Sequence, residues 1–265
     1  MELKGSSILL TGASGGIGQA TAEQLARAGA RLTLFARREE PLLALQHRVE
    51  SLGGTAAVVC GDVRRVSDAE RAVAEAVKRF GRLDGLVNNA GFGVLGLLSE
   101  VNDEDVVEQF ETNVLGPYRV TRAALPELQS RGAGVVVNVA SFAGKVGAPY
   151  YSFYNATKFA LCGMSEAWRR ELRSQGVQVA LVLPAAVETE FLDRMGRERA
   201  LGIGPAGTVL EPEAVARAIV DMLKRPRAEI YVPWWNRWLS LLNAVAPRLS
   251  DRIVTGLFRY PGGSR

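Results

Sequence analysis

The sequence predicts a single α/β domain with a doubly wound parallel sheet of about seven strands and helices on both faces. The first observation is an alternation of short apolar runs with helix-length amphipathic stretches along most of the chain. The second is the nearly continuous apolar run at residues 134–141, which is typical of a strand covered on both sides. The third is size, because 265 residues, 48% of them hydrophobic, can bury one large core.

The elements follow one another in a regular order. Apolar residues three and four apart predict helices over residues 17–28, 39–52 and 67–80, and a long helix within 150–174. Right-handed crossovers between parallel strands then place helices on both faces of the sheet. The strands are expected at residues 7–12, 31–36, 55–60, 83–90, 134–141, 177–184 and 229–233.

Composition excludes several classes of function. Lys plus Arg number 32 against 28 Asp plus Glu, and this mild net charge of +4 is spread along the chain, so we expect no nucleic-acid partner. Cys60 and Cys162 lie far apart and His47 is the single histidine, so neither a disulfide framework nor a metal site is expected. The polar start of the chain does not resemble a signal peptide. We therefore expect a cytoplasmic protein.

The first expected strand runs into a glycine-rich turn, TGASGGIG. Gly12, Gly16 and Gly18 let the backbone bend and approach a phosphate, and a helix starting near Ile17 offers free N–H groups. Ser14 adds a hydroxyl donor. A tight turn without a ligand is the alternative, because the spacing differs from G-x-G-x-x-G. Its place between a strand and a helix favours dinucleotide binding.

The end of the second expected strand indicates which dinucleotide is bound. An acidic residue about twenty positions after the glycines would bond the ribose 2′-hydroxyl of NAD. Here Ala36 cannot do so, whereas Arg37 and Arg38 suit a 2′-phosphate, so NADP(H) is favoured over NAD(H). The alternative is that both arginines only open a solvated helix. Asp62 is a candidate for the adenine pocket, or else a turn cap.

The long helix carries the expected catalytic pair. Tyr154 and Lys158 are four residues apart and share one helix face, so the ammonium is expected to lower the pKa of the phenol. Tyr150 and Tyr151 have no lysine at this spacing and are expected to line a pocket or pack. Ser141 ends a buried strand, at the sheet edge where ligands bind; it would hold a substrate oxygen or cap a turn.

Together these motifs resemble the single-domain branch of the short-chain dehydrogenase/reductase family, with its Rossmann-type fold, from residue 5 to about 232. TGASGGIG is similar to the family's cofactor loop, NNAG at 88–91 to its sheet-stabilising turn, and Tyr154 with Lys158 to its active-site pair. The resemblance implies that Ser141 orients the substrate oxygen and that Asn113 holds a water linking Lys158 to solvent. It further implies cofactor contacts from Asp62, Val63, Asn89, Ala90, Gly91, Tyr154, Lys158, Pro184, Val187 and Thr189.

The implied reaction is hydride transfer between nicotinamide and a carbonyl or alcohol carbon, with Tyr154 as general acid or base. One position departs from the pattern, because Ala185 stands where the family usually has glycine. A β-carbon restricts φ, which puts cofactor affinity or loop geometry in question. The resemblance also makes a homodimer or homotetramer packed through the Tyr154 helix the expectation.

Substrate identity rests on loops with a high apolar content. We expect these loops to form a pocket for a lipophilic ketone or alcohol, although several residues could merely pack. Arg194, Arg197 and Arg199 would meet an acidic group or form a solvated face. The candidate lining residues are Phe92, Val94, Leu95, Phe142, Val146, Tyr150, Tyr151, Phe191, Leu192 and Met195.

The chain divides into a catalytic domain at 1–232 and an amphipathic extension at 233–265. Apolar residues recur at helical intervals in the extension, with interspersed arginines and a break at Pro247. It would cap the cleft, form a subunit interface or lie on a membrane surface. An oxidoreductase is the leading function. An NADP(H)-binding sensor and a membrane-surface scaffold, both without turnover, are the alternatives.

Overall fold

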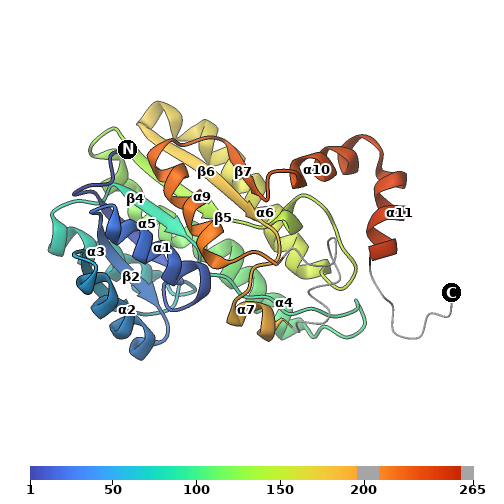
Figure 1. Ribbon diagram of the computed structural model, residues 1–265, viewed down its shortest axis with the longest axis horizontal. Helices are drawn as coiled ribbons and strands as arrows, with labels where there is room; N and C mark the ends of the chain where they lie inside the picture. Colours follow the sequence, from blue (N-terminus) through green and yellow to red (C-terminus); the bar gives the residue numbers. More distant parts are fainter. Residues whose placement is uncertain (196–208, 258–265) are drawn as a thin grey trace.

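The computed structural model describes residues 1–195 and 209–257 (Figure 1). All seven strands run parallel in one sheet of order β3-β2-β1-β4-β5-β6-β7, so the predicted doubly wound α/β fold is confirmed. The strands are β1 (Ser7–Thr11), β2 (Arg31–Ala36), β3 (Thr55–Cys60), β4 (Gly85–Asn88), β5 (Gly134–Val139), β6 (Val177–Pro184) and β7 (Glu229–Val232).

Helices cover both faces of this sheet. On one face α1 (Gly16–Arg27) packs against α2 (Glu39–Ser51) and α9 (Pro212–Lys224) (Figure 1). The other face carries α3 (Val66–Phe80), α5 (Gly116–Gln129) and α6 (Ser152–Glu171). Shorter elements connect them: α4 (Asp103–Phe110), the π-helical turn η1 (Glu111–Leu115), the 3₁₀ turns η2 (Phe142–Gly144) and η3 (Arg173–Gln175), and α7 (Glu190–Arg194).

Helix α3 shows how the apolar spacing produces this packing. Ala69, Val73, Ala76 and Phe80 recur at intervals of three and four and are all buried. The helix ends at Gly81, which adopts a φ of 72°, a conformation that a glycine reaches without a steric penalty. The predicted helix at residues 67–80 therefore forms within one residue of its expected start.

A buried polar network ties the middle of the sheet to the helices. The Asn88 Nδ2 atom donates to Asn138 Oδ1 at 2.8 Å and to Thr121 Oγ1 at 3.0 Å, and Asn138 Nδ2 donates to Ser165 Oγ at 2.8 Å. These bonds join β4 and β5 to α5 and α6. Because a buried amide without a partner is costly, the network specifies one arrangement of α6 on the sheet.

The chain leaves β7 into two further helices, α10 (Asn236–Val245) and α11 (Pro247–Leu257). Figure 1 shows that they extend beyond the edge of the sheet, on the side where α6 begins. Among the described residues, no helix combines the length and the hydropathy needed to cross a bilayer.

Candidate active site

A cavity of about 640 Å³ lies at the carboxyl ends of the strands. Its size falls within the range of small-molecule sites, and this sheet edge is where ligands bind in doubly wound folds. The cavity collects residues that follow β1, β2, β3, β4, β5 and β6, which are far apart in sequence. Most of the sequence motifs therefore meet in one place.

The glycine-rich turn forms a cradle on the cavity wall. Gly12 has a φ of 64°, and a β-carbon there would lie 2.7 Å from Ala90 Cα. Gly16 has a φ of 46°, and its β-carbon would lie 2.5 Å from Thr189 Cγ2. Helix α1 begins after Gly15 with no side-chain cap and no acidic residue in its first turn. The glycine backbone can therefore approach a pyrophosphate closely, and the free N–H groups and dipole of α1 can bind its negative charge.

Gly18 has a different role from the one predicted. It does not line the cavity, and a β-carbon at this position would lie 2.2 Å from Gly12 O and 2.9 Å from Ala13 Cα. Gly18 therefore lets α1 pack against the turn. The remaining predicted residues of the turn, Gly12, Ser14, Gly16 and Ile17, do line the cavity.

The NNAG turn holds β4 against the end of β1. Asn89 Nδ2 donates to Thr11 O and to Gly12 O, both at 3.1 Å, while the Asn89 and Ala90 amides donate to Thr11 Oγ1 at 3.0 Å. Asn89, Ala90 and Gly91 all line the cavity. The turn thus supports the glycine cradle from behind.

Arg37 and Arg38 both reach the cavity beside the glycine turn. Arg38 donates to Ser14 O at 3.0 Å and pairs with Glu190 at 3.2 Å, and Arg37 lies 3.7 Å from a Glu108 carboxylate oxygen. These carboxylates keep both guanidinium groups near the sheet edge. Two cations next to the cradle suit an anionic group on the adenosine ribose.

Asp62 and Val63 also line this part of the cavity. The Asp62 carboxylate accepts hydrogen bonds from Arg64 at 2.7 and 2.9 Å, and its backbone amide donates to Asp68 at 2.9 Å. Although burial acts in the opposite direction, the hydrogen bonds and charge of Arg64 hold the pKa of Asp62 below its usual value. The group is therefore a fixed anion at neutral pH.

Three of the predicted catalytic side chains converge in the same cavity. Tyr154 forms a side-chain hydrogen bond with Ser141, whose hydroxyl also accepts from the Ala143 amide at 3.1 Å. Lys158 Nζ lies 5.6 Å from the centre of the Tyr154 ring and donates to Val139 O at 3.3 Å. Ser141, Tyr154 and Lys158 all line the cavity.

The acidity of this pair differs from the expectation. Burial raises the pKa of Tyr154 to about 12, although the Ser141 hydrogen bond acts in the opposite direction. Burial also lowers the pKa of Lys158 to about 8, because an ammonium is poorly solvated there. The predicted lowering of the tyrosine pKa by Lys158 is therefore wrong: burial raises this pKa, the opposing effect comes from Ser141, and Tyr154 holds its proton at neutral pH.

Asn113 lies behind the catalytic pair, outside the cavity wall. Its Nδ2 atom donates to Phe92 O at 2.7 Å and to Thr157 Oγ1 at 3.0 Å, while its Oδ1 atom accepts from the Phe92 amide at 2.8 Å. Thr157 in turn donates to Tyr154 O at 2.8 Å. The Asn113 side chain thus fastens the loop after β4 to the catalytic helix from the π-helical turn η1.

Replacement of Lys158 by methionine should stabilise the protein near neutral pH when no cofactor is added. The folded pKa of about 8 lies below the unfolded value, so between the two the unfolded chain binds more protons and stability rises with pH. The gain in melting temperature should therefore be largest below pH ~8 and shrink toward pH ~10. Thermal melts across this range test it, with the exposed Lys78→Met as control; a pH-independent gain would contradict it.

The predicted substrate wall is only partly assembled. Phe142, Tyr151, Phe191, Leu192 and Met195 line the cavity, and the Tyr154 and Phe191 rings are 6.1 Å apart. The other five candidates do not line the cavity and instead pack within the loops. One is Leu95, and four more lie outside the lining. These four are Phe92, Val94, Val146 and Tyr150.

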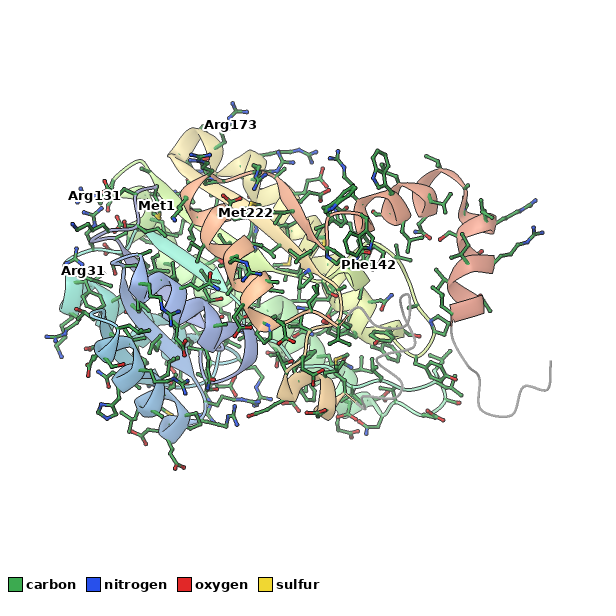
Figure 2. All side chains as sticks on the ribbon, viewed as in Figure 1. Met1, Arg31, Arg131, Phe142, Arg173 and Met222 are labelled. Carbon is green, nitrogen blue, oxygen red and sulfur yellow. The ribbon has the colours of Figure 1, made fainter. Side chains whose placement is uncertain are left out.

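The C-terminal extension supplies further wall residues, and two of them, Ile253 and Leu257, belong to its predicted apolar helical pattern. Trp235, Asn236 and Leu239 line the cavity, as do Ile253 and Leu257 of α11. Figure 2 shows Phe142 on the side of the sheet toward these helices. Helical spacing in the extension was the available signal, but it could not tell which side of α10 faces the protein. Arg197 and Arg199 lie outside the described residues, as does the Arg194 side chain.

Ala185 adopts an ordinary backbone conformation. Among the described residues, Tyr150 is the one non-glycine residue with a positive φ, at 70°. Ala185 lines the cavity, and its amide donates to Val232 O at 2.8 Å. The alanine therefore introduces no strain into the loop that carries Val187 and Thr189, both of which line the cavity with Pro184.

Comparison with known proteins agrees with this geometry. Residues 6–200 match the family model described as short chain dehydrogenase. The chain belongs to this family. A relative from Arabidopsis thaliana, 11-beta-hydroxysteroid dehydrogenase-like 4A, is 36% identical over 250 residues, which cover 94% of this chain and 83% of the relative. This short-chain dehydrogenase is therefore an oxidoreductase that uses a nicotinamide cofactor.

Two solved structures share the fold of this short-chain dehydrogenase. A variant of actinorhodin polyketide ketoreductase with NADPH has a TM-score of 0.78 at 31% identity and covers 87% of this chain and 97% of its own. The 3-ketoacyl-(acyl-carrier-protein) reductase from Brucella melitensis, complexed with NADH, has a TM-score of 0.81 at 28% identity with the same coverage. Both forms of the cofactor thus occur among similar structures.

Proposed function

We propose that this short-chain dehydrogenase is an NADPH-dependent reductase of lipophilic ketones, able to run in reverse on the corresponding alcohols. One observation carries the proposal: Tyr154, Ser141 and Lys158 meet in a single cavity with a glycine cradle and an apolar wall. When bound, the nicotinamide supplies the hydride. The cavity residues then have to position a carbonyl carbon next to it and protonate the oxygen.

Each catalytic side chain has a defined task in this proposal. The Ser141 hydroxyl holds the carbonyl oxygen beside the Tyr154 phenol, with which it already shares a hydrogen bond. Tyr154 donates its proton to that oxygen, and its raised pKa keeps the phenol protonated before reduction. Lys158 binds the nicotinamide ribose and stabilises the phenolate left behind. Asn113 holds the catalytic helix in register through Thr157 and the Phe92 loop.

The cofactor preference follows from Arg37 and Arg38. Charge-assisted hydrogen bonds are worth about 1.5–3 kcal/mol, so Arg37→Ala/Arg38→Ala should weaken the binding of NADPH by about 10–100-fold. The binding of NADH should change much less, because NADH lacks the 2′-phosphate. Kinetics with both cofactors measure the shift. Arg27→Ala/Arg48→Ala, which removes two arginines away from the cavity, is the matched control, and an equal loss for both cofactors would contradict the assignment.

The proposed substrate class rests on the apolar wall. Aromatic and aliphatic side chains line the same cavity as Tyr154, which suits a ketone on an extended apolar skeleton. The names of the similar proteins, a hydroxysteroid dehydrogenase-like protein and two reductases of ketoacyl or polyketide chains, support the same class.

NADPH oxidation against aliphatic, aromatic, steroidal and acyl-thioester ketones tests the proposal. We expect turnover that increases with the apolar size of the ketone, because larger apolar groups fill more of the wall. Tight NADPH binding without turnover of any member would instead favour a cofactor sensor. Rates on the alcohols with NADP⁺ give the preferred direction.

We further propose a homodimer or homotetramer in the cytoplasm. Val107, Leu115, Tyr118 and Phe159 expose apolar surface on α4, η1, α5 and α6, which supports a subunit contact through the Tyr154 helix. Cys60 and Cys162 are free, which suits a reducing compartment. Sedimentation gives the oligomeric state. We also propose that the chain consists of a catalytic domain at 1–232 and an extension at 233–265 that caps the cleft.

A further inference from the structure

Helices α10 and α11 are apolar on two sides. On the inner side, Leu239, Ile253 and Leu257 line the cavity. On the outer side, Trp234 and Val245 are 69% and 79% exposed. A helix that only capped a cleft would need one apolar side, so the outer side requires a separate explanation.

The outer residues form a continuous stripe. Trp234, Trp238, Leu241 and Val245 recur at intervals of four, three and four, which places them along one side of α10 and the turn before it. Leu249 extends the exposed apolar surface onto α11. We call these five residues the outer stripe.

Arginines accompany the outer stripe. Residues 233–257 contain Arg237, Arg248 and Arg252 but only one acidic residue, Asp251, and all four are exposed. Within the part of the chain that the structure describes, none of these arginines forms an ion pair. About half of the other arginines whose side chains the structure describes have an acidic partner. The extension therefore presents uncompensated positive charge beside exposed tryptophans.

Polar contacts fix the outward direction of this stripe. Ser250 is fully buried and donates to Asn243 Oδ1 at 2.9 Å, while Asn243 Nδ2 donates to Lys145 O at 3.5 Å. Tyr231 of β7 donates to Ser240 Oγ at 3.4 Å. These contacts hold α10 on the body of the protein through the side opposite the stripe, so the tryptophans remain outside.

We infer that the outer stripe binds the surface of an anionic lipid bilayer and that α10 and α11 form the passage by which a lipophilic substrate moves from the bilayer into the cavity. Tryptophan beside arginine matches the boundary between acyl chains and anionic headgroups. With 10 and 11 residues, the helices are about half the ~20 needed to span, which suits a position parallel to the surface. The passage rests on the proposed function; the lipid contact does not.

A bilayer explains the stripe better than a second copy of the chain does. A copy would have to match uncompensated arginines with acidic residues, and a symmetric contact would bring Arg237, Arg248 and Arg252 toward their own equivalents. Anionic headgroups match these charges directly. A separate apolar surface on α4, α5 and α6 is already available for a subunit contact.

Flotation of the full chain with vesicles tests the lipid contact without any need for turnover. We expect the protein to float with vesicles of phosphatidylcholine mixed with phosphatidylglycerol, and less with phosphatidylcholine alone. Trp234→Ser/Trp238→Ser should reduce binding to the mixed vesicles by about tenfold or more. Arg237→Gln/Arg248→Gln/Arg252→Gln should remove mainly the preference for the anionic lipid, as should added salt.

Leu43→Ser/Val66→Ser is the matched control, because it removes two exposed apolar side chains from other surfaces and should float like the original protein. A wild-type protein that stays unbound, or a tryptophan variant that floats unchanged, would overturn the lipid contact. If that variant instead converts an oligomer to monomers, the stripe is a copy interface and the inference is wrong.

Turnover separates the passage from the chemistry. The tryptophan variant should keep its rate on a small water-soluble ketone and lose about tenfold on a long-chain ketone presented in vesicles. Equal rates on the vesicle-borne ketone would overturn the passage. If the wild-type protein oxidised NADPH with none of the ketones, the proposed function would be contradicted. The flotation result would not be affected.

Discussion

Replacement of Tyr154 by phenylalanine should lower kcat by about 10²–10⁴-fold, the contribution of a positioned general acid. The phenol lines the cavity, is bonded to Ser141 and is protonated at neutral pH, so it is placed to protonate the oxygen that Ser141 holds. NADPH binding should stay within a few-fold, because the glycine cradle and the arginines are untouched. Steady-state rates and fluorescence titration with NADPH measure the two quantities.

Substitutions of two further tyrosines are controls for this prediction. Tyr118→Phe removes a hydroxyl from an exposed residue that accepts a hydrogen bond from Arg122, and activity should be unchanged. Tyr151→Phe removes the hydroxyl of a cavity residue but keeps its ring, which lies 6.0 Å from that of Tyr154, and should affect KM more than kcat. If Tyr154→Phe kept its activity within a few-fold, or if Tyr151→Phe lost as much, Tyr154 would not be the proton donor.

Gly18→Ala should weaken NADPH binding severely and destabilise the fold. The new β-carbon would lie 2.2 Å from Gly12 O, a backbone atom that cannot move aside without shifting the cradle. Overpacking of this kind costs about 1–3 kcal/mol of unfolding free energy. Thermal or denaturant unfolding gives the stability, and NADPH titration gives the affinity.

Gly163→Ala is the matched control for this substitution. Gly163 lies in α6, is exposed, and has open space where its β-carbon would be. Alanine there should raise stability by about 0.5–1 kcal/mol, because it reduces the entropy of the unfolded chain. A Gly18→Ala protein that binds NADPH normally would show that close packing at this glycine does not shape the cradle.

Local patterns singled out the Tyr154 helix without help from the structure. Tyr154 was separated from Tyr150 and Tyr151 by a lysine one helical turn away, a relation that depends only on helix geometry. Ser141 was recognised because the carboxyl ends of parallel strands meet at one edge. Both inferences need only the type of each element. The structure accordingly places all three predicted side chains, Ser141, Tyr154 and Lys158, in one cavity.

Long-range burial decided what local patterns could not. Spacing predicted that Lys158 would lower the pKa of Tyr154, but the surrounding core removes water from both groups and reverses the direction. Gly18 and Asn113 belong to predicted motifs, yet each contacts other parts of the protein and neither faces the cavity. Their neighbours come from segments distant in the chain.

The amino-acid sequence by itself determined the doubly wound sheet, the glycine turn and the Tyr154–Lys158 pair, because periodicity and short spacings encode them locally. Only the tertiary structure decided which sides of α10 and α11 face the cavity, which loop residues line it, and how acidic Tyr154 and Lys158 are. An amphipathic pattern specifies that a helix has an apolar side, but the partner of that side depends on contacts between residues far apart in the chain.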